Sequence, residues 1–193
     1  MIITIVRHGE TIENSRRICQ GQLPGTLSEQ GILQAQQLAA SLAKNVVPDA
    51  IITSDLQRAI DTAEILREVI APKLQLQTDE RLRERGFGSF QGCVFPEEES
   101  EFHLPSDAET EQSLLQRTQS MAASLIALPY QHVLVVSHGV TIKALLAHLL
   151  EDVKLYDTLP IVSNCSVSEL IIDNHINRNR KLSKLDVSLK KEV

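Results

Sequence analysis

The chain has 193 residues, 42% of them hydrophobic and 23% charged, so it can bury a core large enough to fold without disulfides or metal ions. Its net charge of −6 argues against nucleic acid as a partner, and its three widely spaced cysteines argue against a disulfide framework or a zinc site. It also lacks an apolar run of the roughly 18 to 20 residues that a membrane helix needs. We therefore expect a cytoplasmic protein that needs no cofactor and binds no membrane, and whose oligomeric state the sequence leaves open.

Short apolar runs alternate with amphipathic segments along the chain, which predicts strands alternating with helices. In chain order we expect a strand over 2–6, a helix from Thr26 or Ser28 to about Asn45, a strand over 50–53, a helix from Ser54 or Asp55, a strand over 74–78, a helix from about Thr110, a strand over 133–136, a helix over 140–150 and a strand over 167–172. This order predicts an α/β fold, a three-layer α/β/α sandwich around a mostly parallel central sheet.

Two charged segments stand apart from this alternation. Residues 96–111 contain seven acidic residues and no lysine or arginine, and we interpret them as a mobile, solvated excursion. Residues 177–193 are basic and read as a frayed tail, the favoured interpretation, or as a final helix that binds an acidic surface. We therefore expect a single domain over residues 1–176, followed by a basic C-terminal tail.

Two histidines follow apolar strands directly. His8 lies in Arg-His-Gly-Glu-Thr after the first strand, and His138 lies in Ser-His-Gly after the strand over 133–136. Arg-His-Gly-Glu arises by chance in roughly one chain of this length in a thousand. Because ligands of parallel sheets bind at the carboxyl ends of the strands, both histidines are expected to meet at one site.

Several blocks in the same order resemble the histidine phosphatase superfamily, the phosphoglycerate mutase-like proteins, from Ile2 to about Leu170. Besides the two histidine motifs, these blocks contain Asn14, Gln20-Gly21, Leu27-Ser28-x-x-Gly31, Thr53-Ser54-Asp55-Leu56-x-Arg58-Ala59, Leu82-x-Glu84-x-x-Phe87-Gly88 and Asn164-Cys165-Ser166. The branches of similar length include alpha-ribazole phosphatases, fructose-2,6-bisphosphatase-like enzymes and broad-specificity phosphatases. The resemblance implies a phosphohistidine intermediate at His8.

The chemistry of phosphoryl transfer suggests a role for each of five residues. A neutral His8 can attack phosphorus without a metal ion. Arg7 and Arg58 can each offer paired N–H donors to phosphate oxygens, and His138 can stabilise charge on the same oxygens. Glu84, whose block matches the family's acid, is the expected general acid and base.

Four further residues are expected to bind substrate. The resemblance implies that Asn14 supplies an uncharged donor, and Gln20 and Gly21 match a family block beside it. Gly139 opens the helix after His138, where a backbone amide can face phosphate.

Plainer interpretations stand beside these roles. Arg58 can be a surface arginine that pairs with Asp55 or Asp61, and Glu84 can pair with one of the arginines at 81, 83 and 85. Glu109 and Arg117 resemble another family block, but we leave both outside the core site.

Three functions are compatible with these residues. The first is a phosphatase acting on a small-molecule phosphate monoester. The second is a phosphoglycerate mutase-type phosphotransferase, which the short segment between Glu84 and His138 disfavours. The third is a non-catalytic module that binds a phosphorylated ligand, which the presence of the complete catalytic set disfavours. If the acidic segment 96–111 covers the pocket, we expect it to repel bisphosphates and to favour a single phosphate.

Overall fold

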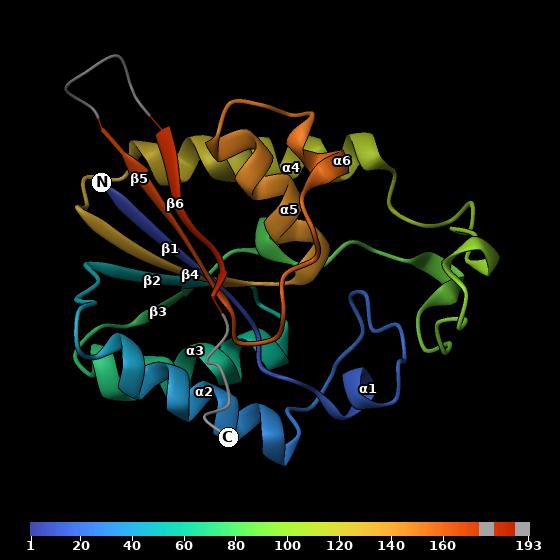
Figure 1. Cartoon of the computed structure of the whole chain (residues 1–193), viewed down its shortest axis with the longest axis horizontal. Helices are drawn as coiled ribbons and strands as arrows, with labels where there is room; N and C mark the ends of the chain where they lie inside the picture. The colour runs from blue at the N-terminus through green and yellow to red at the C-terminus, as the bar shows by residue number, and fades with distance from the viewer. Residues whose placement is uncertain (174–179, 188–193) are drawn as a thin grey trace.

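The computed structural model describes residues 1–173 and 180–187, which fold around one six-stranded sheet (Figure 1). The strand order is β3-β2-β4-β1-β5-β6. The strands are β1 (Ile2–Arg7), β2 (Ala50–Thr53), β3 (Leu76–Thr78), β4 (His132–Ser137), β5 (Val167–Ile172) and β6 (Arg180–Val187). Strands β1 to β4 are parallel, whereas β5 is antiparallel to β1 and β6 is antiparallel to β5. The prediction of a mostly parallel central sheet is confirmed.

Helices cover both faces of the sheet, which gives the expected three layers. The α-helices are α1 (Ile12–Ser15), α2 (Glu29–Leu42), α3 (Gln57–Ile70), α4 (Glu111–Ala127), α5 (Gly139–Leu149) and α6 (Leu155–Thr158), and short 3-10 helices cover Glu80–Leu82, Gly88–Phe90 and Glu99–Glu101. Figure 1 shows α2 and α3 on one face and α4 and α5 on the other. None of these helices is long and apolar enough to cross a membrane, within the residues described.

Alternating side chains of the strands supply one core on each face. Ile3 and Ile5 of β1 pack with α4 and α5, whereas Val6 packs with α2 and α3. Small residues such as Ala35 and Ala63 are fully buried on the second face. Both faces of β1 are therefore buried, as its continuous apolar run predicts.

The caps of the helices differ in part from expectation. Ser28 and Thr110 cap α2 and α4 as predicted, each with its side chain accepting a backbone N–H. At α3, however, the N-cap is Leu56, which makes no side-chain capping bond. The Ser54 hydroxyl accepts the N–H of Leu56, one residue before the first residue of the helix. Strand β3 is also shorter than the predicted 74–78.

The C-terminal segment is the largest difference from expectation. Arg180–Val187 forms β6, neither a frayed tail nor a helix, and its pairing with β5 extends the sheet beyond residue 176. The strand is basic and lies at the edge of the sheet, where charged side chains are common because one side of the strand stays unpaired. The other residues of the predicted tail lie outside the described ranges.

The pairing of β1 with β4 brings the two histidine motifs together. Arg7 lies opposite Ser137 in the parallel register, so His8 and His138 leave the sheet side by side. The His8 amide donates to the Ser137 carbonyl at 3.0 Å. The carboxyl ends of β1 and β4 thus position one site, as expected.

Candidate active site

The loop before β5 fixes the backbone of Arg7 and His8. The Cys165 amide donates to the Arg7 carbonyl at 3.0 Å, and the Asn164 side-chain amide donates to the His8 carbonyl at 2.9 Å. The Arg7 guanidinium itself donates to the Val162 carbonyl at 2.6 Å. This loop, which the sequence indicated only as a family block, therefore sets the position of the first histidine motif.

His8 is held as a neutral imidazole with a defined tautomer. Its Nδ1 lies 2.7 Å from the Gly9 carbonyl oxygen, and because a carbonyl only accepts, Nδ1 carries the proton and Nε2 the lone pair. Burial lowers the pKa of His8 well below 6.5, and the charges of Arg7 and Arg58 lower it further. At pH 7 the ring is uncharged and Nε2 is ready to act as a nucleophile.

His138 lies against His8, with 5.1 Å between the ring centroids. Its side chain is fully buried, and neither ring nitrogen has a hydrogen-bond partner among the described residues. Burial, together with the positive charge of Arg58, lowers its pKa well below 6.5. A neutral His138 ring can donate one N–H to an anion bound beside His8, although its own side chain is not among those that line the cavity around His8.

Arg58 is a buried cation that crosses from α3 to the loop after α1. Its side chain is 1% exposed, and its two terminal nitrogens donate to the carbonyls of Gly21 and Leu23 at 2.7 and 2.9 Å. Burial lowers its pKa to about 10, which leaves it protonated at pH 7. Asp55 pairs with another arginine and Asp61 accepts from Gln57, so the surface ion-pair interpretation of Arg58 is wrong.

Glu84 is held by backbone donors at the N-terminus of α5. Its carboxylate accepts the amides of Arg85, Val140 and Thr141 at 2.9, 3.2 and 3.1 Å, and the Thr141 hydroxyl at 3.3 Å. None of the ion pairs between described residues includes Glu84. The plain ion-pair interpretation is therefore wrong, and the carboxylate is oriented by α5.

Arg117 clamps the loop that carries Glu84. Its guanidinium donates to the carbonyls of Arg81 and Arg83 at 2.8 Å each and to that of Glu84 at 3.2 Å. It also forms an ion pair with Glu109, whose carboxylate accepts the Gly86 amide at 3.0 Å. Arg117 and Glu109, which lie outside the predicted core site, thus position the loop that carries Glu84. The sequence carries no signal for such contacts to backbone carbonyls.

The four predicted binding residues all line one cavity of about 700 Å³, together with Arg7, His8, Arg58 and Glu84. The Asn14 amide oxygen accepts from the Thr11 backbone, which leaves its NH₂ group as a donor. The side-chain oxygen Oε1 of Gln20 is buried without a hydrogen-bond partner among the described atoms. Gly21 has a φ of 52°, which suits glycine, and directs its carbonyl to Arg58.

Gly139 lets the N-terminus of α5 approach Arg7 closely. A Cβ atom at this position would lie 2.7 Å from the Ile161 side chain and 3.5 Å from the Arg7 guanidinium carbon. The helix N-terminus thus adds its positive dipole end to the cavity beside Arg7.

Cys19 is a second possible nucleophile in the lining of the cavity. Burial raises the pKa of the Cys19 thiol to about 12, so Cys19 stays protonated at pH 7. Across residues 1–173 and 180–187, no cluster of histidine, cysteine and acidic side chains could hold a metal ion. Of His8 and Cys19, the neutral His8 ring is therefore the better candidate for a nucleophile.

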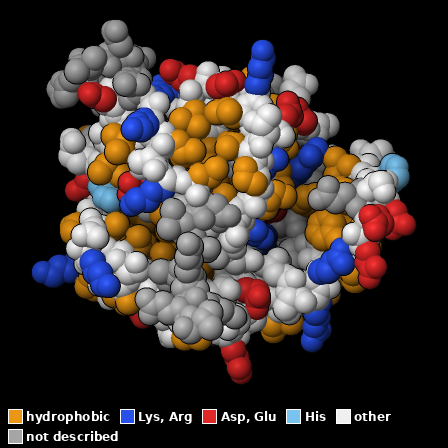
Figure 2. Space-filling view, in the orientation of Figure 1, with side chains coloured by type: hydrophobic (Ala, Val, Ile, Leu, Met, Phe, Trp, Pro, Cys, Tyr) orange, Lys and Arg blue, Asp and Glu red, His pale blue; other side chains and the backbone are white. Residues whose placement is uncertain are grey.

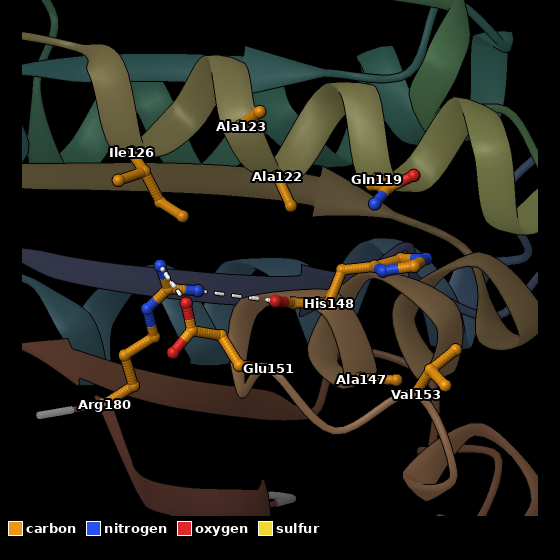
Figure 3. A pocket seen from close by; sticks show the side chains of 9 residues that line it. All are labelled: Gln119, Ala122, Ala123, Ile126, Ala147, His148, Glu151, Val153 and Arg180. Carbon is orange, nitrogen blue, oxygen red and sulfur yellow. Dashed lines mark hydrogen bonds and ion pairs between the residues drawn. The ribbon is translucent and has the colours of Figure 1, made fainter. Parts of the chain in front are cut away.

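A second cavity, of about 730 Å³, lies between α4, α5 and β6 (Figure 3). Arg180 forms an ion pair with Glu151 at 2.9 Å and also donates to the backbone carbonyl of His148. Figure 3 shows both contacts. The remaining walls are mostly alanines and other apolar side chains of α4 and α5. Arg180, the cation of this lining, is already paired with Glu151, so this cavity offers no counterpart to Arg7 and Arg58 of the first cavity.

The two buried histidines predict that acid destabilises the fold. The unfolded chain takes up protons on these rings near pH 6.5 and the folded chain does not, so the free energy of unfolding falls as the pH drops below 6.5. Each ring contributes up to about 1.4 kcal/mol per pH unit. Denaturant titrations between about pH 5 and 8, in a buffer without phosphate, should show this slope. His8→Asn should reduce the slope, and equal slopes in the wild type and in His8→Asn would contradict the account.

Comparison with known proteins agrees with this geometry. The family model for the histidine phosphatase superfamily (branch 1) matches residues 3–184. The probable phosphoglycerate mutase GpmB of Proteus mirabilis is 33% identical over 187 residues, which cover 89% of this chain and 85% of that protein. Another relative, the phosphoglycerate mutase-like protein 4 of Arabidopsis thaliana, is matched over only 41% of its own length.

Two solved structures show the same fold over nearly the whole chain. A mycobacterial glucosyl-3-phosphoglycerate phosphatase, in complex with VO3, has a TM-score of 0.84 and 30% identity, with 96% of this chain and 98% of that chain covered. The alpha-ribazole phosphatase of Shigella flexneri has a TM-score of 0.83 and 27% identity, with 96% of both chains covered. Since the family model also spans almost the entire sequence, the chain belongs to the histidine phosphatase superfamily, branch 1.

Proposed function

We propose that this protein is a metal-independent phosphatase that hydrolyses small-molecule phosphate monoesters through a phosphohistidine on His8. The observation that carries the proposal is the His8 ring, neutral and locked through Nδ1 to the Gly9 carbonyl beside two arginines. A lone pair on Nε2 can attack phosphorus at pH 7 without a metal ion. The phosphatase names of the two structural neighbours support the same reaction class.

In the first step, Nε2 of His8 attacks the phosphorus atom in line with the ester oxygen. The N–P bond forms as the P–O bond to the alcohol breaks, and the Glu84 carboxyl group donates its proton to the departing oxygen. Arg7, Arg58 and the neutral N–H of His138 hold the non-bridging oxygens, whose charge they stabilise in the transition state.

In the second step, water attacks the phosphohistidine. The Glu84 carboxylate accepts a proton from this water, the N–P bond breaks, and inorganic phosphate leaves with His8 neutral again. Each group ends the cycle in its starting protonation state, so turnover needs no cofactor.

Thr141 should position Glu84 for proton transfer. Thr141→Val keeps the shape of the side chain but removes its hydroxyl. That hydroxyl lies 2.6 Å from the Arg83 carbonyl oxygen and 3.3 Å from a Glu84 carboxylate oxygen. We expect kcat/KM, which reports the first step, to fall roughly 3- to 10-fold for alkyl phosphates, since one hydrogen bond is lost, and to change little for 4-nitrophenyl phosphate, whose leaving group needs no proton.

Two further variants control this result. Thr141→Ser should restore the rate, and Thr118→Val should leave it unchanged, because Thr118 is equally buried but its hydroxyl bonds within α4. An equal loss with both classes of ester would show that Thr141 does not act through the acid.

Phosphate release from a panel of monoesters that includes 3-phosphoglycerate, in the presence of EDTA, tests the proposed function. We expect release by the wild type and none by His8→Asn. Conversion of 3-phosphoglycerate to its 2-isomer without release would favour the mutase that the GpmB relative's name suggests. Binding of inorganic phosphate with neither reaction would favour a non-catalytic binding module.

A further inference from the structure

All four phenylalanines of the chain gather in one cluster. Phe87, Phe90, Phe95 and Phe102 have ring centroids 4.9 to 6.4 Å apart, mostly in edge-on or tilted contacts. They belong to the segment after β3, which Figure 1 shows extending to the right of the sheet. Only 3% of the residues in the chain are aromatic, so the gathering of all four phenylalanines at one place is a distinctive feature of this surface.

Three of these rings form a wall of the catalytic cavity. Phe87, Phe95 and Phe102 line it together with Leu104, and their side chains stay partly exposed. Phe90 packs against the cluster from outside the lining. Apolar surface left in contact with water is unfavourable, so a ligand that covers this wall gains binding free energy.

Other residues of the cavity lining are also apolar. Val140 of α5, Tyr156 of α6 and Ile161 of the loop before β5 line it, and Ile161 is 55% exposed. Hydrophobic side chains border a hollow at the right of the space-filling view (Figure 2). The cavity thus has a cationic end at Arg7 and Arg58 and apolar sides.

The acidic segment 96–111 contributes little charge to this cavity. Phe102 and Leu104 face the cavity from this segment, and Glu97 is its one acidic residue among the described residues of the lining. Arg17, Arg85 and Lys143 line the same cavity. These cations outnumber the acidic residues of the lining, so the expected repulsion of multiply charged ligands loses its basis. The apolar part of the lining offers a separate source of selectivity.

We propose that the cavity selects phosphate monoesters whose alcohol carries an aromatic ring, with the ring between the phenylalanine wall and Ile161. The proposal rests on the proposed function for its phosphate end. An aromatic ring suits the wall because it can join the edge-on contacts of the cluster as well as cover apolar surface. The cavity volume, about 700 Å³, lies in the range of sites that enclose a whole small molecule.

Binding of two phosphonates tests this inference independently of catalysis. Propylphosphonate and 3-phenylpropylphosphonate share the same anionic end and cannot be hydrolysed, and calorimetry gives both dissociation constants. We expect the wild type to bind the phenyl compound about 10-fold or more tightly, the gain for burying one ring. Equal affinities would overturn the inference even if the panel shows hydrolysis, whereas a clear preference without hydrolysis would overturn only the proposed function.

Matched variants locate the ring. Phe102→Ala should reduce the preference to about 3-fold or less, while Phe90→Ala, from the same cluster but outside the lining, should keep it. Ile161→Thr offers a second variant at an exposed position, and Ile171→Thr on β5, also exposed, is its control. An unchanged preference in both Phe102→Ala and Ile161→Thr would overturn the placement of the ring.

Discussion

His8→Asn is expected to lower kcat by at least ~10⁴-fold, because it removes the nucleophile from a site whose steps all pass through it. Asparagine can still place an N–H near the Gly9 carbonyl that His8 Nδ1 contacts at 2.7 Å, so the local backbone should persist. What is lost is Nε2 and its lone pair. Initial rates with an alkyl and an aryl phosphate measure the effect, and both esters should lose activity.

The phosphate-binding end of the site provides the control for this variant. Arg7 and Arg58 stay in place in His8→Asn, so inorganic phosphate should bind within a few-fold of the wild-type affinity. A variant that binds phosphate normally and retains more than about a hundredth of wild-type kcat would show that His8 is not the nucleophile.

Arg58→Met should lower kcat/KM by about 10³-fold, in the range seen when a donor to transition-state charge is removed. The side chain is 1% exposed, and methionine is close in length to its aliphatic stem, so the substitution removes the guanidinium and keeps most of the buried stem. It also leaves the carbonyls of Gly21 and Leu23 without their donor, which should reduce the free energy of unfolding by about 1–3 kcal/mol.

Arg67→Met is the matched control on the same helix. Arg67 forms a partly exposed ion pair with Glu64 at 2.6 Å, and its loss should change neither kcat/KM nor stability by much. Arg58→Lys keeps a charge but not the planar fork, and should fall between the two. If Arg58→Met stays within 10-fold of the wild type in kcat/KM, the guanidinium does not bind the transferring group.

The core of the site was predictable because two strongly apolar strands end at its histidines. β1 and β4 are buried on both faces, so their positions follow from composition alone, and parallel pairing then brings His8 and His138 together. Arg58 and Glu84 needed the family resemblance, since each has acidic or basic neighbours that offer an ordinary ion pair. The structure assigns those neighbours to other partners.

The features that the sequence did not reveal depend on contacts between distant, polar segments. β6 is a charged edge strand, and its alternation of apolar and polar residues is too weak to distinguish the segment from an unstructured tail. Arg117 meets backbone carbonyls more than 30 residues away, which no side-chain pattern encodes. The phenylalanine wall combines single residues spread from Phe87 to Phe102, so that only the folded loop shows them as one surface.

The most direct test of the account is to trap the phosphorylated protein. Wild-type protein mixed with a ³²P-labelled monoester and quenched in alkali within milliseconds should carry label that survives alkali, is released by acid and maps to the peptide containing His8. Glu84→Gln should carry more label than the wild type with an aryl ester, because the water that cleaves the intermediate loses its base. Steady hydrolysis without any labelled protein in either form, or label on a peptide other than that of His8, would contradict the phosphohistidine mechanism.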